Sequence, residues 1–469
     1  MESLPFVRTQ SADTFLRLNI ISLQVSCVGE PPCRAYARSC PRGGWRGINR
    51  RLAFAVERTR LLLNYSFMFD FTLCYTLRKG HILGPFVLGL ILICSTACQS
   101  GKKPPSLLSA DDPLPDPLVM KDGSRVTRPA QWDARRKEML EDILAIQFGH
   151  MPDEIPAIKV RSIEVDEASS TEHSLRRIVI FTTGPRQDIT VRVVLVTPRT
   201  GKGPFPVIVK IGDDHPDEAG VNRRGYAIAL VDTGQLDPGR EGHDVVGPVQ
   251  TAYPDLDWGS LATWAWGASR TLDFLQTLEE IDTSRAIVTG HSRTGKAALL
   301  AGATDLRFKV VVPNGSGCGG AATYRNYRVG AETLELLTRE NRWLFWMHKD
   351  IRRFVGREHA LPFDQHFMRA LVAPRVVLSN DGYEDVWANN FGTQAAYQGA
   401  QPVFDLLGVP KHNMAKFREG GHTFNAEDAG VMLDVADWYW NHGSFPESMN
   451  NLPEPDYELK FFPFVEARP

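Results

Sequence analysis

The sequence predicts an α/β fold in which helices cover both faces of a mostly parallel sheet. Short apolar runs alternate with helical stretches over about 300 residues. Several runs are apolar almost throughout, as in strands that are buried on both faces. With 43% hydrophobic and 23% charged residues among 469, the composition is that of a globular protein and excludes a polytopic membrane protein, a coiled coil and a disordered chain. The formal net charge of -2 offers no basic field for nucleic acid.

The predicted elements follow in order along the chain. Residues 132–148 place apolar side chains at helical spacing. Residues 177–182 and 190–197 are rich in Val and Ile and are expected to pair as antiparallel strands. Further strands are expected at 207–211, 226–231, 286–289, 309–312, 375–379 and 415–418, and helices at 261–278, 296–303 and 431–440. We find no internal repeat, so we expect a three-layer αβα sandwich in a single catalytic domain.

The first 76 residues differ from the rest of the chain. They hold ten arginines, no lysine and five acidic residues, together with four of the seven cysteines. No helical or strand period is apparent there. We therefore expect residues 1–76 to be a disordered extension that precedes the true start of the working protein.

A secretory signal is predicted at residues 77–98. Arg78 and Lys79 precede a mostly apolar run at 82–94, and small residues then lead to Cys98. The run is too short to span a bilayer, which takes about 20 apolar residues. Cys98 is expected to carry a lipid, although Ser95 stands where an aliphatic residue is usual in such signals. Residues 99–117 are then expected to be a flexible linker to a domain at 118–469.

The sharpest motif is Gly290-His291-Ser292-Arg293-Thr294-Gly295, which joins a predicted strand to a predicted helix. Such a turn is typical of a nucleophile elbow, where small residues let the strand and helix approach each other. The Ser292 hydroxyl would project above the sheet, beside helical amides that can stabilise an oxyanion. The spacing departs from G-x-S-x-G, because the second glycine comes one residue late. A serine between glycines is, taken alone, more often a plain turn.

A serine nucleophile needs a base and an acid, in the chain order Ser, acid, His. His422 follows Gly420-Gly421 in a loop before the last predicted helix. The acid should follow the strand at 375–379, where Glu384 and Asp385 are both available to orient the imidazole. We favour Asp385 over Glu384, and both over Asp381, which lies closer to the strand end.

These residues resemble the glucuronoyl esterases of carbohydrate esterase family 15, in their bacterial form. The motif at 290–296 is similar to the family signature G-C/H-S-R-x-G-K. The resemblance covers about residues 130–442 and continues in Trp264-Ala265-Trp266-Gly267, Ser316-Gly317-Cys318-Gly319-Gly320, Leu361-Pro362-Phe363-Asp364 and Asp385-Val386-Trp387-Ala388. It implies an α/β-hydrolase that cleaves the ester between 4-O-methyl-glucuronate on xylan and lignin alcohols, with no metal or other cofactor.

The resemblance also implies roles for individual residues. Ser292 would be the nucleophile and His422 the base, while the Arg293 side chain would help to hold the oxyanion. Lys296, Trp387 and Glu332 would contact the sugar. From composition alone, Arg293 would be a salt-bridged surface residue and Trp387 a core residue.

Two departures from the family pattern matter. Fungal members place the glutamate of the catalytic triad at the position that Gly315 occupies here. Glycine has no carboxylate, so the resemblance implies that the acid comes from the later loop, which favours Asp385. The fungal cysteine before the nucleophile is His291 here, so the disulfide that it forms is absent. Cys318 is then expected to be a free, buried thiol.

We therefore expect a serine carboxylic-ester hydrolase that acts through an acyl-enzyme on a uronate-bearing polysaccharide ester. One alternative is a deacetylase of acetyl xylan or another carbohydrate, and a second is a non-catalytic surface protein that binds carbohydrate. We expect a monomer without a nucleic-acid partner. It would be exported across the inner membrane to the periplasm or cell surface, where only a lipid on Cys98 would attach it to a membrane.

Overall fold

The structure is a computed structural model that describes residues 108–213, 217–238, 247–339, 343–446 and 448–462, with the backbone alone at 108–111. The chain divides into two units, Met1–Gly101 and Lys102–Pro469, and every described residue belongs to the second. The expected extension at 1–76, the signal at 77–98 with Cys98, and residues 99–107 lie outside the described ranges. Within those ranges, no helix has the length and hydrophobicity to cross a membrane.

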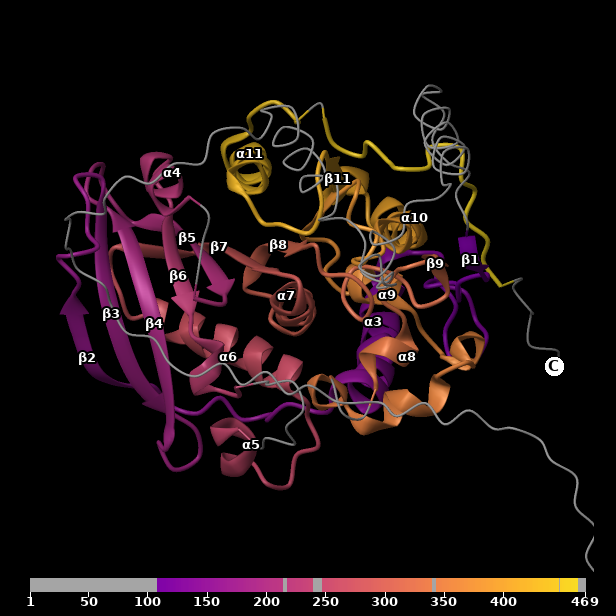
Figure 1. Cartoon of the computed structure of the whole chain (residues 1–469), viewed down its shortest axis with the longest axis horizontal. Coiled ribbons are helices and arrows are strands. Elements are labelled where there is room, and N and C mark those ends of the chain that lie inside the picture. The colour runs from indigo at the N-terminus through magenta and orange to yellow at the C-terminus, as the bar shows by residue number, and fades with distance from the viewer. Residues whose placement is uncertain (1–107, 214–216, 239–246, 340–342, 447, 463–469) are drawn as a thin grey trace, which may run out of the picture. The chain divides into compact units, whose positions relative to one another are not determined.

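A nine-stranded sheet forms the centre of the described unit, in the order β11-β10-β8-β7-β5-β6-β4-β3-β2 (Figure 1). Its strands are β2 (Lys159–Val165), β3 (Ser174–Thr183), β4 (Ile189–Pro198), β5 (Phe205–Ile211), β6 (Ala227–Val231), β7 (Ile281–His291), β8 (Phe308–Asn314), β10 (Val376–Gly382) and β11 (Asn413–Arg418). The strands from β11 to β6 pair in parallel, whereas β6, β4, β3 and β2 pair antiparallel. The predicted sheet is confirmed, including the antiparallel pairing of β3 with β4. A separate antiparallel pair joins β1 (Leu108–Asp111) to β9 (Asn326–Arg328).

Helices cover the sheet on both faces. The α-helices of the described residues are α3 (Trp132–Ile143), α4 (Glu218–Arg223), α5 (Pro248–Ala252), α6 (Ser260–Leu275), α7 (Arg293–Thr304), α8 (Leu334–Leu337), α9 (Gln365–Ala370), α10 (Asn390–Leu406) and α11 (Ala426–Asn441), and not all of them pack on the sheet. Figure 1 shows α4 and α11 on one side of the sheet and α6 and α7 on the other.

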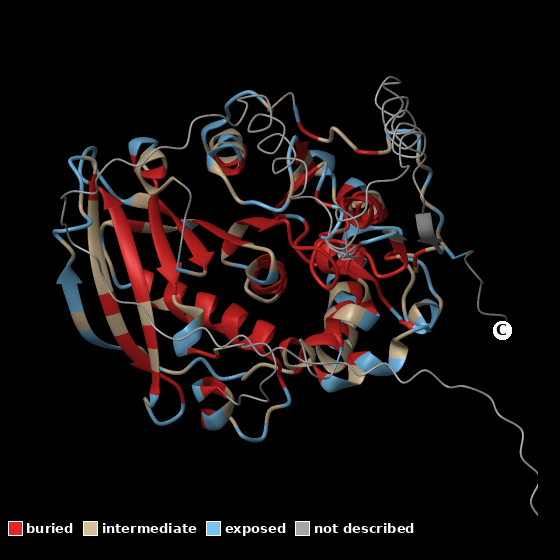
Figure 2. Cartoon of the chain, in the orientation of Figure 1, coloured by how far each residue is buried: buried red, intermediate tan, exposed pale blue. Residues whose placement is uncertain are grey.

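The core is divided between those two faces because successive strand residues point in opposite directions. In β5, Val207 and Val209 join the cluster under α6 and α7, whereas Ile208 joins the cluster under α11. The strands in the middle of the sheet are accordingly buried almost throughout (Figure 2). This accounts for the short, unbroken apolar runs in the sequence, and the three-layer α/β prediction is confirmed.

The prediction missed several shorter elements and two long ones, the edge strand β2 and helix α10. The edge strand β2 is mostly exposed (Figure 2). Even its Val160 and Ile163 are open to solvent, so its sequence has no buried face to mark it. Helix α10 contains Pro402 and several polar residues, which weaken the helical signal. Packing stabilises it instead, since a Cβ on Gly399 would come within 2.9 Å of the His366 side chain.

The predicted start of the domain at residue 118 needs correction. Strand β1 lies within the expected linker and pairs with β9. Leu114 is fully buried, and its backbone N–H donates to the carbonyl of Lys460. Residues 108–117 are therefore docked on the domain through backbone pairing and a buried leucine.

The topology gathers four loops at one edge. Strands β7, β8, β10 and β11 are neighbours and all run in parallel, so their carboxyl ends meet. Open α/β sheets bind ligands outside that edge. The loops that follow these four strands carry Ser292, Gly315, Asp385 and His422.

Candidate active site

Ser292 occupies the turn between β7, which ends at His291, and α7, which begins at Arg293. Its backbone has φ 57° and ψ −124°, a strained conformation for a residue with a side chain. The glycines on either side are required by close packing. A Cβ on Gly290 would lie 2.3 Å from the Thr294 carbonyl oxygen, and one on Gly295 would lie 2.9 Å from that of Asn314. The local geometry is that of a nucleophile elbow.

The structure brings Ser292, His422 and Asp385 together in one hydrogen-bonded series. The Nε2 atom of His422 lies 2.9 Å from Ser292 Oγ, and its Nδ1 atom lies 2.6 Å from Asp385 Oδ2. The other carboxylate oxygen of Asp385 accepts the backbone N–H of Ala388 at 3.0 Å. Because both oxygens have donors, the carboxylate is fixed toward the imidazole. Such a series can move a proton from the serine hydroxyl to the histidine.

The other two carboxylates of this region have different surroundings. Glu384 is exposed, and its side chain has no hydrogen bond or ion pair with any described residue. Asp381 is fully buried in β10, where its Oδ1 accepts the Gly315 backbone N–H at 3.0 Å. Neither forms a hydrogen bond to His422 among the described contacts, whereas Asp385 does.

The electrostatics suit a base at position 422. The hydrogen bond that His422 donates to Asp385 raises the pKa of His422 above its usual value, although partial burial acts in the opposite direction. Burial raises the pKa of Asp381 to about 7, so this carboxyl is neutral over much of the acidic range. Burial lowers the pKa of His291, which favours its neutral form beside His422.

Arg293 is exposed at the first position of α7, next to Ser292. Within the described part of the chain, its guanidinium forms no ion pair or hydrogen bond. The first amides of a helix also lack intrahelical acceptors. The interpretation of Arg293 as a salt-bridged surface residue therefore finds no support in these contacts, and the guanidinium is available to a ligand.

A cavity of about 180 Å³ opens beside the serine. It is lined by Ser292, Arg293, Lys296, Gly315, Ser316, Gly317, Glu332, Trp343, Trp346, Trp387, Ala388 and His422. The three residues predicted to contact the sugar, Lys296, Trp387 and Glu332, thus all line this cavity. The Trp387 side chain is 37% exposed, which contradicts the interpretation of a core residue.

Trp343 and Trp346 were missed from the sequence. Their rings stack with centroids 5.2 Å apart, and Trp343 meets Trp387 edge-on at 6.1 Å. A concentration of aromatic residues at 343–346 outside any predicted strand or helix was the signal that could have indicated them.

Lys296 and Glu332 form a buried ion pair at the cavity wall. The Lys296 ammonium donates to Glu332 Oε2 at 2.7 Å and to the carbonyl oxygens of Ser316 and Cys318 at 2.7 and 2.6 Å. An ammonium has three protons, so all its donors are used. Lys296 therefore fixes the loop after β8 and orients Glu332. The Cys318 thiol is free and buried, as predicted.

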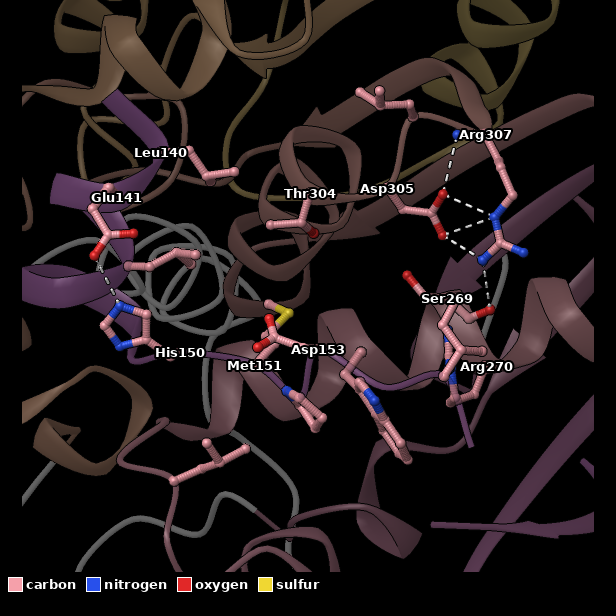
Figure 3. A pocket seen from close by; sticks show the side chains of 16 residues that line it. Leu140, Glu141, His150, Met151, Asp153, Ser269, Arg270, Thr304, Asp305 and Arg307 are labelled. Carbon is pink, nitrogen blue, oxygen red and sulfur yellow. Dashed lines mark hydrogen bonds and ion pairs between the residues drawn. The ribbon is translucent and has the colours of Figure 1, made fainter. Parts of the chain in front are cut away.

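Larger cavities lie away from the serine. One of about 730 Å³, drawn in Figure 3, lies between the segment 140–155, α6 and the turn after α7. Its side chains mostly satisfy one another: Glu141 accepts from His150 on one side, and Asp305 accepts from Arg307 on the other (Figure 3). It shares no residue with the cavity at Ser292. Among the described residues, no group of histidine, cysteine and acidic side chains could hold a metal ion.

Comparisons with known proteins agree with this geometry. The family profile described as "Glucuronyl esterase, fungi" matches residues 180–408. Carbohydrate esterase MZ0003, from an unknown prokaryotic organism, is 29% identical over 397 residues, which cover 71% of this chain and 90% of the relative. The 4-O-methyl-glucuronoyl methylesterase 1 of Wolfiporia cocos is 27% identical over 65% of this chain and 74% of its own.

A solved structure gives the same result. The carbohydrate esterase family 15 (CE15) glucuronoyl esterase from Caldicellulosiruptor kristjansonii superposes with a TM-score of 0.63 at 30% identity, over 76% of this chain and 97% of that one. The chain belongs to carbohydrate esterase family 15, the glucuronoyl esterase family of carboxylic ester hydrolases within the α/β-hydrolase superfamily.

Proposed function

We propose that this protein hydrolyses glucuronate esters, including 4-O-methyl-glucuronoyl esters that join xylan to lignin alcohols. The observation that carries the proposal is the series from Asp385 through His422 to Ser292, which ends at a cavity lined with charged and aromatic groups. The names of the relatives support glucuronate as the acyl group of the ester, since these relatives include 4-O-methyl-glucuronoyl methylesterases.

The reaction proceeds through an acyl-enzyme. His422 takes the Ser292 proton as Oγ attacks the uronate carbonyl carbon, and the carbonyl oxygen becomes an oxyanion. The Arg293 guanidinium and the amides at the start of α7 donate hydrogen bonds to it. His422 then gives the proton to the departing alkoxide as the C–O bond breaks. Water, deprotonated by His422, then attacks the acyl carbon, and His422 returns the proton to Ser292 Oγ as the acyl–Oγ bond breaks, which releases the uronate and free Ser292.

The cavity wall supplies the sugar contacts. Trp387 offers a flat face and an indole N–H to a pyranose. Glu332 can accept a hydrogen bond from a sugar hydroxyl through the oxygen that Lys296 does not hold. Lys296 itself reaches a hydroxyl only by exchanging one of its three present acceptors.

The test is a pair of assays on protein that begins after Cys98. The wild type should hydrolyse benzyl glucuronate much faster than it deacetylates an acetylated xylo-oligosaccharide, and Ser292→Ala should lose nearly all of this turnover. Faster deacetylation would indicate the carbohydrate deacetylase instead. Retention of polysaccharide without cleavage of either ester would indicate the non-catalytic binding protein.

We further propose that the protein is an exported monomer held at a membrane by a lipid on Cys98. The sequence at 77–98 supports this. Expression of residues 77–469 in a bacterium with labelled palmitate tests it, because Cys98→Ser should abolish labelling and release the protein from the membrane fraction. Labelling that survives the substitution would refute the anchor.

A further inference from the structure

The residue before the nucleophile contacts the proposed base. The imidazole of His291 lies against that of His422, with ring centroids 4.6 Å apart and the planes tilted by 40°. His291 has no part in the reaction sequence above. Its neighbour Ser292 points to the cavity, whereas His291 is at the end of β7 and reaches toward β8.

His291 is held in place by a buried amide. Its Nδ1 atom lies 2.6 Å from Oδ1 of Asn314, and the Nδ2 atom of Asn314 donates to the Asn380 carbonyl at 2.8 Å. Because that second bond needs the amide nitrogen, the amide oxygen is the atom that faces His291. An amide oxygen only accepts, so the proton of neutral His291 must be on Nδ1. Asn314 is fully buried, which fixes this arrangement.

Further contacts leave the two rings little room. Phe424 stacks on His291 with an interplanar angle of 14° and a centroid distance of 6.3 Å. A Cβ on Gly315 would lie 3.1 Å from Cε1 of His291 and 3.6 Å from Cε1 of His422. The His422 ring is therefore bounded by His291 and by the Gly315 backbone, while a third of its side chain stays open to solvent.

The charge state of His291 suits this contact. Burial lowers the pKa of His291, and the positive form of His422 lowers it further. The hydrogen bond with Asn314 and the charge of Asp385 raise its pKa, and Lys210 lowers it. His291 therefore stays neutral while His422 titrates, and its ring can touch the imidazolium of the transition state without adding a like charge.

We propose that His291 is a positioning residue, whose neutral imidazole packs on His422 and keeps that ring where it reaches Ser292 and Asp385 together. The proposal rests on the proposed esterase function for its kinetic readout. The geometry requires that the ring itself acts, while the bond to Asn314 only helps to orient it.

Two substitutions separate the ring from its bond. His291→Asn keeps a donor at the place of Nδ1 and so retains the bond to Asn314, but removes the ring. His291→Phe keeps a neutral ring and loses the bond. Displacing a catalytic group by about 1 Å can cost about a hundredfold in rate. We therefore expect His291→Asn to lower kcat on benzyl glucuronate about 10- to 100-fold with KM within about twofold, and His291→Phe to stay within about fivefold of wild type.

A second readout is independent of the ester. Phosphonylation of Ser292 by a fluorophosphonate also needs a correctly placed His422, so its rate should fall in His291→Asn and persist in His291→Phe. The low-field proton resonance of His422 Nδ1–H should broaden in His291→Asn alone. If the wild type cleaves no glucuronate ester yet is phosphonylated with this pattern, the proposed function fails and the positioning role stands.

The remaining outcomes overturn the inference. Wild-type kcat and phosphonylation in His291→Asn would show that the ring is dispensable, and this result suffices even if His291→Phe does not fold. Equal losses in both variants would indicate general destabilisation, and a loss in His291→Phe alone would assign the effect to the Asn314 bond.

Discussion

Replacing Asp385 by asparagine is the most discriminating perturbation of the proposed mechanism. In the structure, Asp385 Oδ1 accepts the Ala388 N–H and Oδ2 accepts from His422 Nδ1. In Asp385→Asn, the backbone donor keeps the amide oxygen, so the amide NH₂ faces His422. Two donors cannot share this contact, and Nδ1 must give up its proton to become an acceptor. The proton then sits on Nε2, which can no longer accept one from Ser292.

We expect a large loss of kcat, because His422 is held in the wrong tautomer although the fold is unchanged. The same exchange in a Ser-His-Asp triad lowers kcat by about 10⁴-fold, or about 5.5 kcal/mol of transition-state stabilisation. Asp385 is only 3% exposed, so water cannot easily replace the lost partner. The pH dependence should change as well. Neutral His422 is the active base, so kcat/KM rises with pH through its pKa. Asp385 raises that pKa, and its loss should move the acidic limb to lower pH.

The assay measures kcat and KM on benzyl glucuronate from pH 4 to pH 9, with thermal unfolding to confirm the fold. Glu384→Gln is the matched control, because it removes the neighbouring carboxylate, which is exposed and makes no side-chain contact with a described residue. We expect this control to stay within about twofold of wild type. A kcat within about tenfold of wild type in Asp385→Asn, or a larger loss in Glu384→Gln, would refute the assignment of the acid.

Three further substitutions test the groups around the site. Arg293→Ala should lower kcat about 10²- to 10³-fold with an unchanged melting temperature, and Arg293→Lys should recover part of the rate; a normal kcat in Arg293→Ala would exclude the guanidinium from the oxyanion site. Glu332→Gln should lower the free energy of unfolding, measured in urea, by about 3–5 kcal/mol, because it leaves the Lys296 ammonium buried without its charged partner. The double variant with Lys296→Met should recover part of that stability. Burial raises the pKa of Asp381 to about 7, so the folded state binds a proton that the unfolded state releases near pH 4. This stabilisation, about 4 kcal/mol at low pH, is lost as the pH rises through 7. Asp381→Asn should therefore gain stability relative to wild type between pH 5 and pH 8 in chemical denaturation, and a constant difference would contradict the burial argument.

The fold was predictable wherever burial imposes a pattern on the sequence. The apolar runs at 207–211 and 226–231 are strands with both faces covered, and such runs allow few other structures. Prediction failed where burial is partial. The edge strand β2 has no apolar face, and residues 108–117 dock through backbone pairing and one leucine, which leave little trace in composition.

The site was predictable for a different reason. A nucleophile elbow needs glycines on both sides of the serine, and the chain order of the α/β-hydrolase fold indicates where to look for the acid and the base. No comparable sequence motif predicts which side chains contact one another around the site. Nothing in the sequence shows that all three protons of Lys296 are taken by the protein, or that Trp343 stands beside Trp387.

The choice between β8 and β10 as the source of the acid follows from the space around His422. The loop after β8 passes the imidazole at Gly315, but a side chain there would begin 3.1 Å from the His291 ring. A side chain at position 315 would have to displace the His291 ring, and the Gly315 backbone is tied to β10 by its N–H bonds to Asn380 and Asp381. The next strand ends one sheet spacing further from Ser292, and its loop turns back so that Asp385 reaches His422 Nδ1 from the far side. The residue before the nucleophile therefore limits what position 315 can carry, because a side chain there would meet the His291 ring before it reached His422.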